Sequence, residues 1–233
     1  MRKLIALNEP KIAIIGSGIA GLAAAVNARK TNSHAKITIL SKENYPPYCK
    51  PSLPFIILGT GSLPDEIGMY PCEFLTSRKI RLLQGFEAQK IDTNERVIRV
   101  RDTKTNEMMQ VDYDTLVLAM GGYDVVPPIE GTDLKTVFTL RTIKDALKIS
   151  GAAKSGKGAV VVGAGPIALS IAEALTKRGV KTKMIIRSRM LRTLIEPDLS
   201  LIVQKRVEKA GVECLLNVEV DEIVGSNNVE CIS

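Results

Sequence analysis

The sequence predicts an α/β protein of two modules, each with a parallel sheet, accompanied by small antiparallel β-meanders. A short apolar run, a glycine-rich turn, a helix-forming stretch and a second apolar run follow one another in residues 11–40, and the same order recurs in residues 158–186. Such a unit of about thirty residues fits a right-handed crossover between parallel strands. The 233 residues, 45% hydrophobic and 24% charged, allow two cores of modest size and exclude a disordered chain.

The first unit is expected to contain a strand over residues 11–15, a helix over 22–30 and a strand over 36–40. Short runs at 96–101, 108–111 and 115–119, separated by polar turns, follow it. They predict a small antiparallel meander that leads back into a buried strand.

The second unit is expected to contain a strand over 158–162, a helix over 167–178 capped by Gly179, and a strand over 181–186. The stretch between Ile143 and Gly158 predicts a short helix followed by a linker rich in glycine, serine and lysine. We therefore predict a boundary between modules at residues 1–148 and 149–233.

The first glycine motif is typical of a turn that binds a pyrophosphate. Gly16 permits the sharp turn, Gly18 lets a pyrophosphate approach the backbone, and Gly21 allows close packing of helix and strand. Free N–H groups and the dipole at the helix start favour negative charge there. The motif alone is weak, but its position between a strand and a helix predicts a Rossmann-like dinucleotide site.

The second motif, from Gly163 to Ala168, repeats the pattern with alanine in the third glycine position, which is tolerated. Two such motifs predict two dinucleotides in one chain. A protein that binds two dinucleotides is expected to pass electrons between them.

The residues after the second strand of each unit should select the nucleotide. Arg187, Arg189 and Arg192 follow the strand in the second unit, where an NAD site usually has a carboxylate. Guanidinium groups bind phosphate through paired hydrogen bonds, so we predict NADP(H) over NAD(H); the alternative is a solvated basic loop. In the first unit the strand ends in Ser41 and Lys42, and the nearest carboxylate, Glu43, is either a ribose ligand or an ordinary exposed turn residue.

Composition argues against several other functions. The cysteines are widely spaced, His34 is the only histidine and lies in a polar stretch, and we therefore expect no metal site and no histidine catalysis. The net charge of +7 is spread along a chain with few aromatic residues, so we expect no nucleic-acid partner. Small residues and glycines interrupt the longest uncharged runs, so we expect no membrane span. Residues 1–7 are too short for a secretory signal, and we predict a cytoplasmic protein.

Several segments together resemble the flavin-dependent pyridine nucleotide-disulphide oxidoreductase superfamily. Residues 48–53, Tyr-Cys-Lys-Pro-Ser-Leu, are similar to a segment of the branch with ferredoxin, rubredoxin and nitrite reductases. Residues 113–122 resemble the second FAD segment, residues 137–142 match the stretch after it, and residues 163–173 with 186–187 resemble the NADPH half of glutathione reductase. The resemblance implies hydride transfer from NAD(P)H to FAD and onward electron transfer to a redox protein or another acceptor.

The resemblance also implies site residues. The first motif would bind the FAD pyrophosphate through Gly16, Ser17, Gly18, Ile19 and Ala20. Glu43 and Lys50 would lie near the FAD ribose and phosphates, and Ala88 would meet the adenine. The central part of FAD would be lined by Ala119, Met120, Gly121 and Arg141. The NADPH pyrophosphate would face Gly163, Gly165, Pro166 and Ile167.

The sequence departs from the family pattern at several places. Pro51 takes the position of the reactive cysteine in the disulphide-reducing branch, and Cys49 is either a thiol near the flavin or a small buried residue. Ser170 replaces the glutamate expected after the second motif, with Glu173 one helical turn later as a candidate substitute.

The family's third FAD segment and its C-terminal interface domain have no counterpart in these 233 residues. Three interpretations follow: a fragment, a chain completed by a second polypeptide, or a reduced form with poor cofactor binding. A non-catalytic dinucleotide-binding or redox-sensing subunit is the alternative to an enzyme, no catalytic residue is identified, and a homodimer stays open.

Overall fold

The computed structural model describes residues 9–59, 67–70 and 72–233, and its described residues form two compact units. The first unit comprises Met1–Cys49 and Pro64–Gly122, and the second comprises Lys50–Leu63 and Tyr123–Ser233. Residues 1–7, which were judged too short for a secretory signal, lie outside the described residues. No helix in the described part of the chain is long and apolar enough to cross a membrane.

The first unit is built on a parallel sheet with the strand order β3-β2-β1-β7. Its strands are β1 (Lys11–Ile15), β2 (Lys36–Ser41), β3 (Ile80–Gln84) and β7 (Thr115–Leu118). Helices α1 (Ile19–Thr31) and α3 (Cys72–Ser77) pack against this sheet. The predicted crossover is confirmed, because Ile14 lies opposite Ile39 on one side and Val117 on the other in parallel register.

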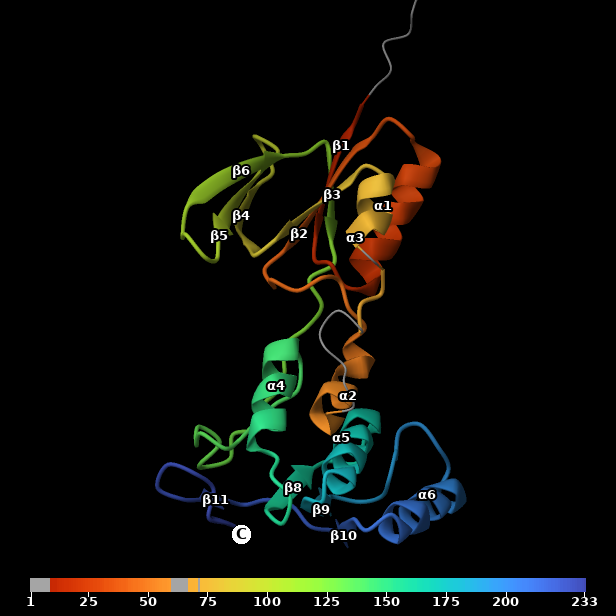
Figure 1. Cartoon of the computed structure of the whole chain (residues 1–233), viewed down its shortest axis with the longest axis vertical. Coiled ribbons are helices and arrows are strands. Elements are labelled where there is room, and N and C mark those ends of the chain that lie inside the picture. Colours follow the sequence, from red (N-terminus) through yellow and green to blue (C-terminus); the bar gives the residue numbers. More distant parts are fainter. Residues whose placement is uncertain (1–8, 60–66, 71) are drawn as a thin grey trace, which may run out of the picture. The chain divides into compact units, whose positions relative to one another are not determined.

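The two faces of this sheet carry different layers, as Figure 1 shows. Because side chains alternate along a strand, Ile14 packs toward α1, where Leu22 and Ala25 are buried. Ala13 and Ile15 face the opposite core, which contains Ile98 and Val100. That core belongs to an antiparallel meander of β4 (Phe86–Asp92), β5 (Val97–Asp102) and β6 (Met108–Asp112).

The meander leads into β7, as predicted, but β7 is not the buried strand that we expected. Thr115 and Leu118 are exposed, and Leu116 and Val117 are half-buried. The physical reason is position: β7 is the last strand of the sheet, and no described strand pairs with its outer edge.

The second unit contains a three-stranded parallel sheet in the order β10-β9-β8. It comprises β8 (Gly158–Val162), α5 (Pro166–Lys177), β9 (Lys181–Ile186), α6 (Pro197–Lys209) and β10 (Glu213–Leu216). The short strands β11 (Ile223–Val224) and β12 (Cys231–Ile232) form an antiparallel pair. A small core of Ile185, Val220 and Ile223 joins that pair to the sheet.

Three further elements of the second unit come from earlier in the chain. These are the 3-10 turn η1 (Lys50–Ser52), helix α2 (Leu53–Leu58) and helix α4 (Ile143–Ala152). Helices α2 and α4 lie side by side (Figure 1), and Arg178 links them to the C-terminal end of α5: its Nη1 donates to Ile57 O and to Ser150 Oγ, both at 2.7 Å. The compact units therefore do not divide at the boundary of 148 and 149 that the sequence predicts, because α2 packs against both α4 and α5.

Candidate functional site

The first glycine turn joins β1 to α1 and is shaped by two glycines that the fold itself requires. Gly16 donates its N–H to Leu40 O at 2.8 Å and has φ +110°, a region that favours glycine. A Cβ at Gly16 would overlap Ala119 O, and a Cβ at Gly21 would overlap Gly16 O. The roles assigned to Gly16 and Gly21 as turn and packing residues thus agree with the local geometry.

Gly18 is different, because nothing in the protein requires glycine there. It is the N-cap of α1, with φ −72° and ψ −176°, and no protein atom lies within 4 Å of a Cβ built on it. The first turn of α1 has no acidic residue and its cap makes no side-chain hydrogen bond. The N–H groups of Ile19, Ala20 and Gly21 precede the first intrahelical bond, from Leu22 N to Gly18 O, and are available to an anion.

The second glycine turn repeats this geometry between β8 and α5. Gly163 has φ +114° and donates to Ile185 O at 2.9 Å, as Gly16 does to Leu40. Gly165 is the N-cap of α5, with φ −80° and ψ 175°, and again no protein atom lies within 4 Å of a Cβ there. Pro166 begins the helix and has no N–H to offer, so Ile167 is the first residue of α5 with a free donor.

The end of β2 brings predicted residues of the first unit next to the first turn. Ser17 Oγ donates to Ser41 Oγ at 2.9 Å, and Ser41 is 6% exposed. The Tyr48 hydroxyl donates to the Glu43 carboxylate at 2.8 Å, while Lys42 points to solvent. Tyr48 is not among the residues predicted from the sequence, because its contact with Glu43 forms only in the folded loop.

The remaining residues predicted for the FAD centre in this unit lie on separate elements. Ala119 donates its N–H to Ile15 O at 2.8 Å, which sets it directly beside the turn. Met120 is 65% exposed and Gly121 has φ +77°. Ala88 lies at a bulge in β4 and packs on the meander side of the sheet.

Lys50 and Arg141 lie together in the second unit, at the N-terminal ends of α2 and α4. Lys50 Nζ donates to Arg141 O at 3.3 Å, and Arg141 N contacts the Asp145 carboxylate at 3.3 Å. Thr142 and Asp145 form a capping box that fixes the start of α4. Arg141 Nε is buried and has no hydrogen-bond partner among the described residues. A buried guanidinium nitrogen without a partner fits a residue whose acceptor is an anionic ligand.

The loop after β9 positions the three arginines of the second unit differently. Arg189 is used for structure, because its guanidinium donates to Ile195 O at 2.6 Å and to Arg192 O at 2.9 Å. Leu191 N donates to Ala164 O at 2.9 Å, so this loop lies against the second glycine turn. Arg187 and Arg192, the two arginines predicted to select NADP(H), have exposed side chains.

Other candidates from the sequence are not assembled into a site. His34 is exposed, Cys49 is half-buried, and no group of three metal-ligating side chains occurs in the described part of the chain. Glu173 forms an exposed ion pair with Lys177 at 2.6 Å, and Ser170 Oγ donates to Pro166 O at 3.0 Å.

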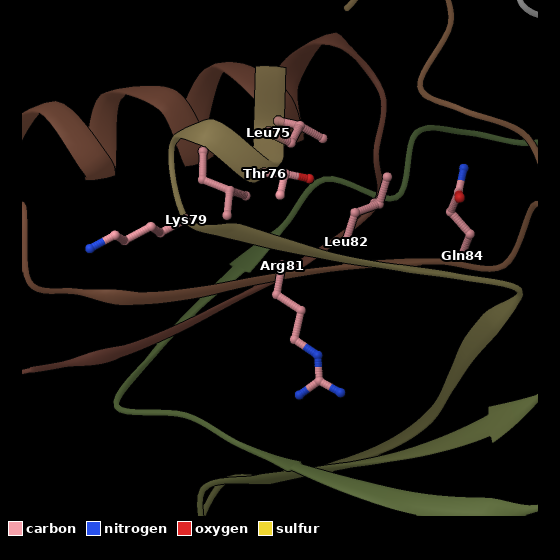
Figure 2. A pocket seen from close by; sticks show the side chains of 7 residues that line it. Leu75, Thr76, Lys79, Arg81, Leu82 and Gln84 are labelled. Carbon is pink, nitrogen blue, oxygen red and sulfur yellow. The ribbon is translucent and has the colours of Figure 1, made fainter. Parts of the chain in front are cut away.

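A shallow groove of about 480 Å³ lies beside β3, and none of its lining residues belongs to a glycine turn. Its lining residues are Leu75, Thr76, Lys79, Ile80, Arg81, Leu82 and Gln84. Figure 2 shows that the side chains of Lys79 and Arg81 point in different directions, so they do not converge on a common ligand.

Comparisons with known proteins agree with this geometry. The sequence model of the pyridine nucleotide-disulphide oxidoreductase family matches residues 10–233. An NADH oxidase of Methanocaldococcus jannaschii is 36% identical over 223 residues, which cover 94% of this chain and 50% of the oxidase. The rubredoxin-NAD(+) reductase of Pseudomonas putida is 29% identical over 93% of this chain and 55% of its own length.

A solved structure of an NAD-dependent persulfide reductase from A. fulgidus superimposes with a TM-score of 0.85 at 27% identity, over 94% of this chain and 42% of that one. The chain thus spans about half the length of the relatives that it matches. With its two glycine turns and its matched sequence, the chain belongs to the pyridine nucleotide-disulphide oxidoreductase family.

Proposed function

We propose that this chain is the cofactor-binding part of an NAD(P)H-dependent flavin oxidoreductase, with FAD at the first glycine turn and NADPH at the second. The observation that carries the proposal is that Gly18 and Gly165 occupy equivalent N-cap positions where the fold leaves room for a side chain. Glycine at both positions is explained if a pyrophosphate occupies that space.

The residues around the first turn fit FAD. Donors at the start of α1 face its pyrophosphate, and the hydroxyls of Ser17 and Ser41 with the Glu43 carboxylate provide partners for ribose and phosphate. Lys50 and Arg141, which the family resemblance assigns to FAD, belong to the second unit. A bound flavin would accept a hydride from nicotinamide and pass electrons to a redox protein or another acceptor; the protein orients both cofactors and supplies charge.

The residues around the second turn favour NADP(H) over NAD(H). Arg187 and Arg192 are exposed on the loop that follows β9, and a hydrogen bond from Leu191 holds this loop against the second turn. A 2′-phosphate would bind at this place. Replacing Arg187 with glutamine should weaken NADP⁺ binding about tenfold and leave NAD⁺ binding nearly unchanged. An unchanged ratio of the two affinities would refute the NADP(H) assignment.

A second candidate is a non-catalytic dinucleotide-binding or redox-sensing subunit that functions with another polypeptide. Both parallel sheets end on a strand with exposed apolar side chains and no described neighbour: Leu118 on β7, and Val160 and Val162 on β8. One relative is named an assimilatory nitrate reductase electron transfer subunit and another a dehydrogenase subunit epsilon. A second chain or a further segment that covers these edges would explain their exposure. A homodimer and a cytoplasmic location remain predictions.

Anaerobic titration distinguishes the two candidates. Purified protein is loaded with FAD and then mixed with NADPH; the flavin oxidoreductase should lose its visible flavin absorbance and should oxidise NADPH steadily once an artificial electron acceptor is added. A protein that binds both cofactors without bleaching is the non-catalytic subunit. Absence of any FAD binding, with and without a polypeptide corresponding to the second half of the relatives, would refute the FAD site.

A further inference from the structure

A carboxylate that the sequence analysis did not consider, Glu219, lies at the end of β9. Arg187 Nε is 3.5 Å from Glu219 Oε1, and the two side chains are 63% and 65% exposed. Strand β10 runs parallel to β9 with Leu216 opposite Ile186, and Val218 N donates to Ile186 O at 3.4 Å. The chain after β10 therefore crosses the end of β9 and brings Glu219 to Arg187.

The guanidinium of Arg187 can turn to a ligand more readily than that of Arg189. Arg189 is bound to two carbonyl oxygens of its own loop, at Arg192 and Ile195. Among the described residues, Glu219 provides the carboxylate within ion-pair distance of Arg187. An ion pair as exposed as this one adds little to fold stability, so replacing Glu219 should leave the fold intact.

We propose that Glu219 is a specificity-determining residue, which weakens the preference of this site for a 2′-phosphate over a 2′-hydroxyl. The proposal rests on the NAD(P)H site proposed above. Glu219 competes with a 2′-phosphate for the guanidinium of Arg187, and its negative charge repels the dianion. A 2′-hydroxyl has no charge, so the carboxylate leaves NAD(H) binding nearly unaffected.

The test is isothermal titration of NADP⁺ and NAD⁺, which differ only in the 2′-phosphate, into the wild-type chain and Glu219→Gln. A unit charge about 7 Å from a phosphate of about −1.5 charge in a watery environment corresponds to roughly fivefold in affinity. We expect Glu219→Gln to bind NADP⁺ about fivefold more tightly and NAD⁺ within about twofold of the wild type, with a smaller effect at high salt.

Glu213→Gln is the matched control. Glu213 forms an ion pair with Lys183 at 3.0 Å on the same sheet, with side chains 54% and 51% exposed. Its removal changes the charge by the same amount but away from Arg187, so the ratio of NADP⁺ to NAD⁺ affinity should stay at the wild-type value. Circular dichroism melts of both variants verify folding.

The outcomes separate this proposal from the function on which it rests. If Arg187→Gln weakens NADP⁺ binding while Glu219→Gln leaves the affinity ratio unchanged, the NADP(H) site stands and the role of Glu219 is refuted. If Glu219→Gln weakens NAD⁺ binding several-fold, Glu219 is a direct ribose ligand and the proposal is wrong. If the folded wild-type chain binds neither dinucleotide, both the NAD(P)H site and the role of Glu219 are refuted.

Discussion

Alanine at Gly18 is expected to weaken cofactor binding, whereas alanine at Gly21, three residues away in the same turn, is expected to destabilise the fold. Gly21 lies inside α1, where alanine gains about 1 kcal/mol of helix propensity. Its Cβ, however, would lie well inside 3.0 Å of Gly16 O, a backbone atom that cannot turn away. Separating the helix from the strand costs about 1–3 kcal/mol by analogy with overpacked cores. We therefore expect Gly21→Ala to destabilise the fold by about 1 kcal/mol.

Gly18→Ala should leave stability almost unchanged. Its φ of −72° and ψ of −176° are allowed for alanine, and its Cβ would meet no protein atom within 4 Å. Alanine lowers the conformational entropy of the unfolded chain and so stabilises the fold by about 0.4–1 kcal/mol. This gain offsets a similar loss, because alanine is less favourable than glycine at an N-cap. The new methyl group would, however, occupy the space proposed for the pyrophosphate. Loss of one or two hydrogen bonds to a charged group should weaken FAD binding by at least about tenfold.

Two measurements test this pair. Urea denaturation gives the free energy of unfolding, and titration with FAD, followed by quenching of flavin fluorescence, gives the affinity. Gly165→Ala is the control, because it alters the equivalent N-cap of α5 and should weaken NADP⁺ binding without changing FAD affinity. Wild-type FAD affinity in a stable Gly18→Ala variant would refute the reasoning, and so would equal destabilisation by both substitutions.

Two further predictions concern stability. Arg178→Met removes the 2.7 Å hydrogen bonds to Ile57 O and Ser150 Oγ, and urea denaturation should show a free energy of unfolding lower by about 1–3 kcal/mol. Arg178→Lys should recover part of this loss. Equal losses in the two variants would contradict a hydrogen-bonding role. The hydrogen bond from Arg101 lowers the pKa of Glu87, so the stabilisation is present above the ordinary carboxyl pKa and is lost as pH falls through the lowered one. Because both side chains are about a third exposed or more, Glu87→Gln should lower the free energy of unfolding by less than about 1 kcal/mol at neutral pH. Urea denaturation should show that this difference between variant and wild type vanishes in acid. A difference that stays constant with pH would exclude the ion pair as its cause.

Local sequence patterns predicted the elements of both crossovers, because their information lies within a few residues. The predicted strands at 11–15, 158–162 and 181–186 match β1, β8 and β9. Helix α1 begins three residues before the predicted start at Leu22, because Gly21 is a poor helix former by itself and is tolerated for its close contact with Gly16.

Elements that depend on distant partners were not predicted. Helix α2 has only six residues, too few to form a stable helix in isolation, and it forms where Arg178 of a distant segment donates to the carbonyl oxygen of Ile57. The exposure of β7 was also missed, since an apolar run reads as buried whether or not a neighbouring strand is present.

The sequence alone determined that the chain has two glycine turns, each between a strand and a helix, because that geometry is specified within a few residues. Only the tertiary structure showed which glycines the fold itself needs. A Cβ at Gly16 would overlap the backbone of Ala119, which lies more than a hundred residues away in the sequence. The same holds for the nucleotide choice. The arginines after β9 were visible in the sequence, but Glu219 comes within 3.5 Å of Arg187 only because β10 lies beside β9.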